Sequence, residues 1–195
     1  TSPYVVIVMP TEGQMFAVNS TYVEWTAVDN TTGLWYWWVW VNDDAPYNVT
    51  GLLNFTFEGL PEGHHVIHVK AWDLVGNAQE KTVSILTDLS APEIDITSPA
   101  NLAYLPSRTV TVTFDVEDQY SGVKEIWVKL ASSAVWTSVG LNSSYTLTVV
   151  ADTGTLPYTF LVMAEDNVGN NATSQVQFFV DTVAPTVTAH TPLAN

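Results

Sequence analysis

Acidic side chains are the residues of this 195-residue chain best suited to chemistry, and some of them recur in a fixed pattern. The five residues Asp73-Leu-Val-Gly-Asn77 return as Asp166-Asn-Val-Gly-Asn170. Gly takes a positive φ without steric cost, and an Asp before a tight turn accepts its free backbone N–H groups, so each copy predicts a β-hairpin turn. Carboxylates of such turns, if brought together, would supply the oxygen ligands that Ca²⁺ prefers.

One group of oxygen ligands is predicted to converge. In a β-sandwich, the loops that follow the second and sixth strands of a repeat meet at the pole where its first strand enters. These loops and the incoming linker, which also carries Glu93, would bring together Asp88, Glu117, Asp118, Asp166 and Asn170. Ca²⁺ takes six to eight oxygens at ~2.4 Å, so we expect a structural Ca²⁺ site that stiffens the domain junction. The alternative is that Asp118 and Asp166 only cap turns.

Catalytic chemistry is poorly supported by the sequence. The only His residues are His64, His65, His68 and His190, and no Gly-x-Ser-x-Gly elbow or Gly-rich phosphate loop is present. His64 and His68 are four residues apart on a predicted strand, which separates them by ~13 Å, too far for one metal to join easily. Because no nucleophile and base can be paired, we predict that the protein is not an enzyme and needs no catalytic cofactor.

Composition excludes several classes of partner. Charged residues make up only 13% of the chain and divide into 20 acidic and 5 basic, a formal charge of −15. Such an acidic surface argues against nucleic acid and anionic membranes. The longest apolar run, 34–41, is too short for a transmembrane helix, which needs ~20 residues. The chain has no Cys, so disulfides do not indicate its compartment. The start at Thr1-Ser-Pro predicts a mature or trimmed end.

Glycosylation sequons indicate an extracellular location. The motif Asn-x-Ser/Thr occurs at Asn19, Asn30, Asn48, Asn54, Asn142 and Asn171. Chance would give about two for this content of Ser and Thr, so we predict a glycosylated exterior. The alternative is that a Thr-rich β protein accumulates sequons passively.

Internal repeats set the domain organisation. Proline pairs seven residues apart begin at Pro3, Pro92 and Pro185, and each pair encloses a short β-like run. The segment 23–29 matches 112–118 at an offset of 89, whereas later landmarks such as Asp73 and Asp166 are offset by 93. We therefore predict one domain at 1–88, a second at 89–181, and the linker and first strand of an incomplete third repeat at 182–195.

Each predicted domain consists of short strands and no helix. The strands of the first copy are expected near 4–9, 21–28, 34–41, 52–58, 65–73 and 78–87. Those of the second are expected near 93–98, 109–117, 123–130, 134–139, 144–150, 157–165 and 172–180, with a third-copy strand near 186–191. Strands rich in Val, Ile, Thr and aromatic residues at this spacing predict an all-β fold of tandem immunoglobulin-like β-sandwiches.

The order of these motifs resembles a known family. The sequence Pro-x6-Pro, then Asp118-x3-Gly-Val123, then Ala-x-Asp-x-Val-Gly-Asn170 is similar to the bacterial and archaeal immunoglobulin-like repeats of cell-surface proteins. The resemblance covers nearly the whole chain and implies an Ig-like or fibronectin-III-like sandwich at the cell surface. Members of this family include S-layer proteins, adhesins, stalks and spacers on secreted enzymes. The motifs are structural, so they imply fold and location more than activity.

An aromatic face is predicted on the first domain. Run 34–41 is apolar on both sides, but the copy at 123–130 alternates, and the offset then places Trp37, Val39 and Val41 inside. The outward residues predicted to form an interaction face are Tyr36, Trp38, Trp40 and Trp72, with Trp127 in the second domain. Monomers seldom expose such a patch. The alternative is that a loop, a glycan or the neighbouring domain covers it.

These features together predict a non-enzymatic, extracellular, glycosylated repeat segment of a cell-surface assembly, namely an S-layer, filament or adhesin stalk. Its expected partners are neighbouring repeats or sister subunits. The alternative function is a carbohydrate-binding module of a secreted enzyme, because Trp38 and Trp40 would lie ~7 Å apart, near the spacing of sugar rings.

Overall fold

The computed structural model describes residues 1–188. Residues 189–195, which include His190 and part of the predicted strand at 186–191, lie outside the described residues, and no strand is present at 181–188. Within the described part the regular elements are strands, as the sequence predicts, so the all-β fold class is confirmed. No helix in residues 1–188 has the length and apolar character to cross a membrane.

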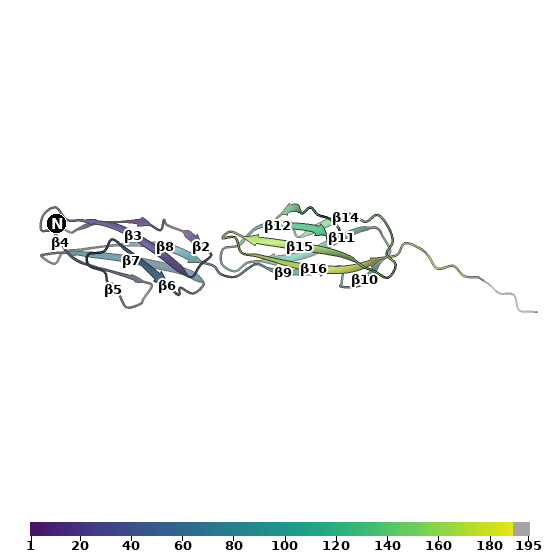
Figure 1. Ribbon diagram of the computed structural model, residues 1–195, viewed down its shortest axis with the longest axis horizontal. Helices are drawn as coiled ribbons and strands as arrows, with labels where there is room; N and C mark the ends of the chain where they lie inside the picture. The colour runs from purple at the N-terminus through teal and green to yellow at the C-terminus, as the bar shows by residue number, and fades with distance from the viewer. Residues whose placement is uncertain (189–195) are drawn as a thin grey trace, which may run out of the picture. The chain divides into compact units, whose positions relative to one another are not determined.

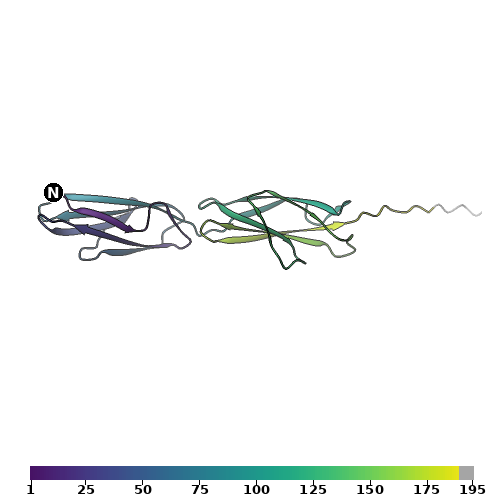
Figure 2. The same cartoon turned by 90° about the horizontal axis from the view of Figure 1, so that it is seen from above.

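The first sandwich consists of two sheets that face each other (Figures 1 and 2). The smaller sheet has the order β1-β3-β6 and contains β1 (Tyr4–Met9), β3 (Ser20–Val28) and β6 (Asn54–Glu58). The larger sheet has the order β2-β8-β7-β4-β5 and contains β2 (Gln14–Phe16), β4 (Leu34–Val41), β5 (Tyr47–Asn48), β7 (Gly63–Asp73) and β8 (Ala78–Thr87).

The second sandwich repeats this arrangement. Its smaller sheet has the order β14-β11-β9 and contains β9 (Glu93–Ser98), β11 (Thr109–Glu117) and β14 (Ser144–Thr148). Its larger sheet has the order β10-β16-β15-β12-β13 and contains β10 (Ala103–Leu105), β12 (Val123–Leu130), β13 (Thr137–Gly140), β15 (Tyr158–Asp166) and β16 (Asn171–Val180). The repeat in the sequence is therefore a repeat in topology.

Alternation along the strands places the predicted inner faces in the core. On β3, Val23 and Trp25 are buried, and their counterparts on β11, Val112 and Phe114, are buried as well. On β4, Val39 and Val41 are buried, while Trp37 is partly buried and packs against the same core. Because side chains alternate across a strand, the residues between them face outward.

Three short strands were not predicted. They are β2, β5 and β10, of two or three residues each. β2 pairs in parallel with the end of β8, and β10 pairs in the same way with the end of β16. Segments this short carry no measurable alternation, so only their equivalence at an offset of 89 could have identified β2 and β10.

Contacts divide the chain into two compact units. The first unit holds residues 1–92 together with 117–124 and 165–171, and the second holds the remaining described residues. The loop between β11 and β12 and the loop between β15 and β16 thus belong to the first unit. Asp88, Asp118 and Asp166 therefore lie in one unit. The repeat boundaries at 88 and 181 remain a prediction from the sequence.

Candidate functional site

The repeated motif forms a tight turn in which a buried carboxylate holds the backbone. Asp166 is 0% exposed, and its Oδ1 accepts hydrogen bonds from the N–H groups of Val168, Gly169 and Asn170 at 2.9, 2.6 and 2.9 Å. Its Oδ2 accepts from Asn170 Nδ2 at 2.8 Å. Gly169 has φ of 100°, a conformation that favours Gly. The predicted hairpin turn is confirmed, and the carboxylate is its organising group.

The first copy of the turn has the same organisation. Asp73 is also 0% exposed and accepts from the N–H groups of Val75 and Asn77 and from Asn77 Nδ2. Burial raises the pKa of the Asp73 carboxyl, but the hydrogen bonds from Asn77 and Val75 outweigh burial and leave the pKa below its ordinary value. A carboxylate held in this way is charged and oriented at neutral pH.

A second Asp caps the neighbouring loop of each repeat. In the first repeat, the N–H group of Thr32 is the main cause that lowers the pKa of Asp29, to about 2, and the N–H groups of Gly33 and Thr31 act in the same direction against desolvation. In the second repeat, the equivalent Asp118 accepts the N–H group of Gly122 at 2.6 Å.

Three carboxylates converge in the first compact unit. One oxygen of each of Asp88, Asp118 and Asp166 lies within 4.8 Å of the other two. Asp88 and Asp166 are fully buried and Asp118 is half-buried. Asp88 follows β8, Asp118 follows β11 and Asp166 ends β15, so strand ends far apart in the sequence position the group. Three negative charges at this separation repel one another unless a cation or several donors offset them.

Backbone donors hold Asp88 in place. Its Oδ2 accepts from the N–H group of Ser121 at 3.0 Å, and its Oδ1 accepts from the N–H group of Ser90 at 3.2 Å. Its carbonyl oxygen accepts from Asn170 Nδ2 at 3.2 Å. Asn170 Nδ2 therefore donates to both Asp166 and Asp88, and these two hydrogen bonds fix the orientation of its amide group.

The other predicted ligands lie apart from this group. Glu117 is exposed and is not one of the three converging carboxylates, and Glu93 is exposed as well. Ser121 was not among the predicted ligands, and its Oγ is buried and has no hydrogen-bond partner. Its position three residues after Asp118 matches that of Thr32 after Asp29, which is the signal that could have revealed it.

The donor set fits a hard cation. Carboxylate oxygens and a hydroxyl oxygen are the ligands of Ca²⁺, and each carboxylate oxygen has two lone pairs, so those that accept N–H groups retain acceptor capacity. Ser121, whose N–H group donates to Asp88, also carries a buried hydroxyl oxygen of the suitable type that has no hydrogen-bond partner. Three of the five predicted ligands, Asp88, Asp118 and Asp166, are therefore brought together.

The aromatic face, defined as Tyr36, Trp38, Trp40 and Trp72, lies on β4 and β7 of the first sandwich. All four side chains are half-buried, and Tyr36, Trp38 and Trp72 cover one another. Tyr36 stacks on Trp72 with ring centroids 4.6 Å apart and planes at 20°, while Trp38 meets Trp72 at 5.7 Å and 62°. The indole Nε1 of Trp38 is buried without a partner. The face is outside the core, as predicted, but it is not bare.

Further aromatic residues extend this arrangement. Trp40 stacks on His68 with ring centroids 4.7 Å apart and planes at 8°. The Nδ1 atom of His68 lies 2.9 Å from Glu80 Oε1. Trp127 on β12 of the second sandwich is half-buried. The most exposed Trp at this surface is Trp35, at 56%, which the prediction omitted. The register shifts between Leu34 and Tyr36, so Trp35 is the extra residue of a bulge.

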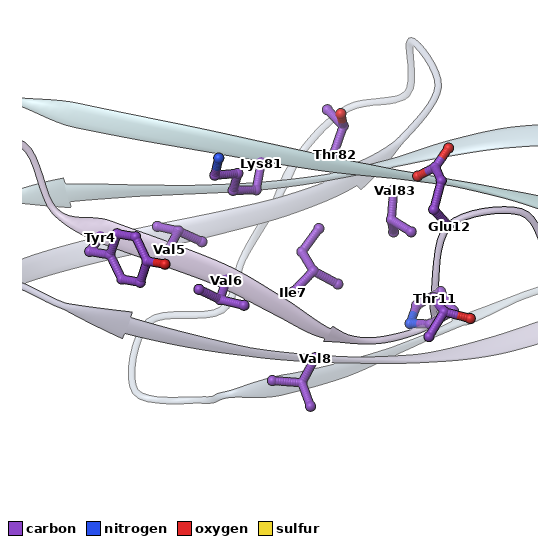
Figure 3. Close-up of a pocket in the computed structure, with 11 residues that line it drawn as sticks. Tyr4, Val5, Val6, Ile7, Val8, Thr11, Glu12, Lys81, Thr82 and Val83 are labelled. Carbon is purple, nitrogen blue, oxygen red and sulfur yellow. The ribbon is translucent and has the colours of Figure 1, made fainter.

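A groove lies between β1 and β8 (Figure 3). Its volume is about 440 Å³, and Ile7 points toward β8 while Val8 points away. Gln79 Oε1 accepts the N–H group of Val5 across the groove at 2.7 Å. Glu12 Oε2 accepts the N–H group of Ser84, which lowers the pKa of Glu12. The lining is mostly apolar, and its polar residues are Thr11, Glu12, Lys81 and Thr82.

Other predicted groups are placed as follows. The six sequon residues Asn19, Asn30, Asn48, Asn54, Asn142 and Asn171 are all exposed. His65 is 3% exposed, and its Nε2 lies 2.8 Å from the carbonyl oxygen of Pro61 and 2.7 Å from Thr87 Oγ1. Thr87 is 0% exposed, so this pair of a His and a hydroxyl cannot reach a substrate.

The fold and its repeated turn define a class of protein, tandem immunoglobulin-like β-sandwiches. Residues 92–159 match the sequence family described as bacterial Ig domain. The predicted resemblance to bacterial immunoglobulin-like repeats is thereby confirmed. No curated protein matches the chain.

Several solved structures have a similar fold. The three N-terminal domains of the Highly Immunogenic Outer Capsid protein of bacteriophage RB49 share 9% identity with a TM-score of 0.53, over 94% of this chain and 71% of that chain. Fibronectin(III)-like modules of CbhA from Clostridium thermocellum share 17% identity with a TM-score of 0.45, over 96% of this chain and 100% of that chain. A bacterial ice-binding adhesin shares 13% identity with a TM-score of 0.47, over 94% of this chain and 67% of that chain.

Proposed function

We propose that this chain is a non-enzymatic structural repeat segment of an extracellular surface assembly, such as an S-layer, filament or adhesin stalk. The observation that carries the proposal is the use of its buried Asp residues. Asp73 and Asp166 hold tight turns in equivalent places of two successive sandwiches. Such groups make each repeat rigid and reproducible. The match of residues 92–159 to bacterial Ig domains supports the same conclusion.

The extracellular location has a direct test. Native material purified from its source should have an intact mass above the 21.4 kDa of the polypeptide, or above the calculated mass of any longer native chain. Treatment with an N-glycan-releasing enzyme should convert the sequon Asn residues to Asp and remove the excess. The six exposed sequon residues are the expected sites. A native mass equal to that of the bare polypeptide would contradict the glycosylated surface protein.

Cation binding is the second part of the proposal. Asp88, Asp118 and Asp166 would hold Ca²⁺, with the hydroxyl of Ser121 as a further oxygen ligand. The ion would offset the repulsion of three carboxylates and tie the loops 117–124 and 165–171 to the segment after β8. Glu117 is exposed and is not one of the three converging carboxylates, so it is not required for this site.

Calcium should raise the thermal midpoint of the chelator-treated protein. At 100 times the Kd, binding to the native state contributes about 2.7 kcal/mol, a rise on the order of 10 °C for a domain of this size. Asp118→Asn should abolish the rise, because it removes the charge of one proposed ligand. Asp118 is chosen because it is the cluster member with the fewest structural hydrogen bonds. Asp29→Asn, at the equivalent place in the first repeat, is the matched control and should retain the rise. An equal rise in both variants would exclude this site.

The aromatic face is proposed as a contact with a sister subunit or neighbouring repeat. A carbohydrate platform is less well supported, because sugar rings stack on open aromatic surfaces. Here Tyr36 covers Trp72, and the planes of Trp38 and Trp72 are inclined by 62°. Exposed Trp35 at the end of β4 adds apolar area that is available to a protein partner.

The double variant Trp35→Glu with Trp40→Lys should prevent self-association while each sandwich stays folded. Trp35 is a bulge residue and Trp40 is half-buried, so charges there remain solvated in the monomer. Trp38→Glu is a poorer probe, because Trp38 packs against Tyr36 and Trp72. Analytical ultracentrifugation and circular dichroism would measure assembly and folding. Unchanged assembly of a folded double variant would refute the contact.

A further inference from the structure

The end of the first repeat binds loops of the second repeat through specific hydrogen bonds. Asp88 Oδ2 accepts the N–H group of Ser121, and the carbonyl oxygen of Asp88 accepts from Asn170 Nδ2. Ser121 lies in the loop that Asp118 caps, and Asn170 lies in the turn that Asp166 holds. One residue at the end of a repeat therefore engages both polar loops of the next.

The first repeat presents the same two donors. Thr32 is the counterpart of Ser121 at an offset of 89, and Asn77 is the counterpart of Asn170 at an offset of 93. Asn77 Nδ2 donates to Asp73 Oδ2 at 2.7 Å, as Asn170 Nδ2 does to Asp166. The N–H group of Thr32 donates to Asp29 at 2.6 Å, whereas that of Ser121 donates to Asp88. The two loops thus differ in the acceptor that this N–H group uses.

The second repeat ends in the matching acceptor. Asp181 is the counterpart of Asp88, and its N–H group donates to the carbonyl oxygen of Leu105 at 3.0 Å, as that of Asp88 does to Phe16 at 2.9 Å. Asp181 Oδ1 accepts the N–H group of Val183 at 3.0 Å, as Asp88 Oδ1 accepts that of Ser90. Asp181 is exposed, whereas Asp88 is fully buried.

The loops of the first repeat also expose apolar surface. Leu74 and Val75, within the turn of residues 73–77, are 61% and 66% exposed. In the second repeat the counterpart of Leu74 is Asn167, whose Nδ2 donates to the carbonyl oxygens of Ser121 and Gly122. The surface at 29–33 and 73–77 therefore combines apolar area with donors that match Asp181.

We propose that Asp181 of one copy of this chain binds the loops 29–33 and 73–77 of a second copy, head to tail. Its carboxylate accepts the N–H group of Thr32 in place of Asp29, and its carbonyl oxygen accepts from Asn77 Nδ2. The partner is thus another copy of the same repeat. This inference rests on the proposed function as a repeat segment, and it adds the residues through which successive copies join.

A duplicated chain tests the contact. Residues 1–184 followed directly by residues 3–195 place Asp181 four residues before Pro3, the spacing from Asp88 to Pro92. With the second copy isotope-labelled by segmental ligation, amide exchange at its Thr32 should be at least tenfold slower than in the single chain. Asp181→Ala in the first copy should abolish this difference. Asp95→Ala, at another exposed Asp, is the control and should preserve it.

The single chain provides a second measurement that does not depend on the duplicated one. There, Asp88→Ala should speed exchange at Ser121 by a similar factor. Equal exchange at Thr32 in the duplicated and single chains, or no effect of Asp88→Ala at Ser121, would overturn the inference. Glycans on native material together with unchanged Thr32 exchange would refute only the head-to-tail contact. Slowed Thr32 exchange with a bare native mass would instead refute only the extracellular function.

Discussion

Replacing Asp166 with Ala is expected to reduce the free energy of unfolding by on the order of 4 kcal/mol, because it removes one acceptor shared by three backbone donors. The N–H groups of Val168, Gly169 and Asn170 point at a carboxylate that is 0% exposed. A fully buried donor left without a partner costs about 1–3 kcal/mol, and these three, on half-buried or exposed residues, should each cost an amount near the lower end of that range. Urea unfolding followed by circular dichroism, in a chelator so that no cation contributes, measures the loss.

Two further variants test whether the loss of stability comes from the missing acceptor. Asp166→Asn retains an acceptor oxygen for the N–H groups and should cost clearly less than Asp166→Ala. Asn171→Ala, at the exposed start of β16, should change stability by no more than about 0.5 kcal/mol. If Asp166→Ala also cost less than about 1 kcal/mol, the carboxylate would not be the organising group of the turn.

Trp25→Ala is expected to cost about 3–5 kcal/mol, the range for deleting a large aromatic side chain from a core. Trp25 on β3 is 1% exposed and lies among the buried residues of the first sandwich. Trp25→Phe should cost only about 1–2 kcal/mol, because its Nε1 has no hydrogen-bond partner to lose. The second repeat already places Phe114 at the equivalent position, where it is 1% exposed.

Unfolding curves of the two Trp25 variants and of Phe114→Ala give the comparison. Phe114→Ala should resemble Trp25→Ala, since both remove a buried ring from the same place in the repeat. If Trp25→Phe were as costly as Trp25→Ala, the indole group itself would be required and the equivalence of the two cores would be wrong.

The sequence predicted the fold and the inner faces because the two copies resolve each other's ambiguity. Strand β4 is apolar on both sides, but β12 alternates, and the offset between them assigned Val39 and Val41 to the core. The repeated Asp also predicted the turns, since an Asp side chain accepts the free backbone N–H groups of a tight turn. Both predictions depend on periodicity and spacing, which are properties of the sequence itself.

Other features depend on three-dimensional detail that spacing does not encode. The stacking of Tyr36 on Trp72 follows from side-chain rotamers, so the self-covering of the aromatic face was not predicted. The exposure of Trp35 follows from a bulge in the pairing of β4 with β7. The repeat spacing could have pointed to Ser121, but its contact with Asp88, 33 residues earlier in the chain, is a result of the fold.

The parallel pairing of β2 with β8 has a consequence for mechanical load. These strands lie near the entry and the exit of the first repeat, and Gln14, Met15 and Phe16 stand opposite Ile85, Leu86 and Thr87. Tension applied along the chain pulls two such parallel strands past each other. Their interstrand hydrogen bonds are then loaded together in shear and do not open one at a time. The same geometry at β10 and β16 gives the second repeat an equivalent clamp. A surface protein built from these repeats would therefore resist stretching at every repeat.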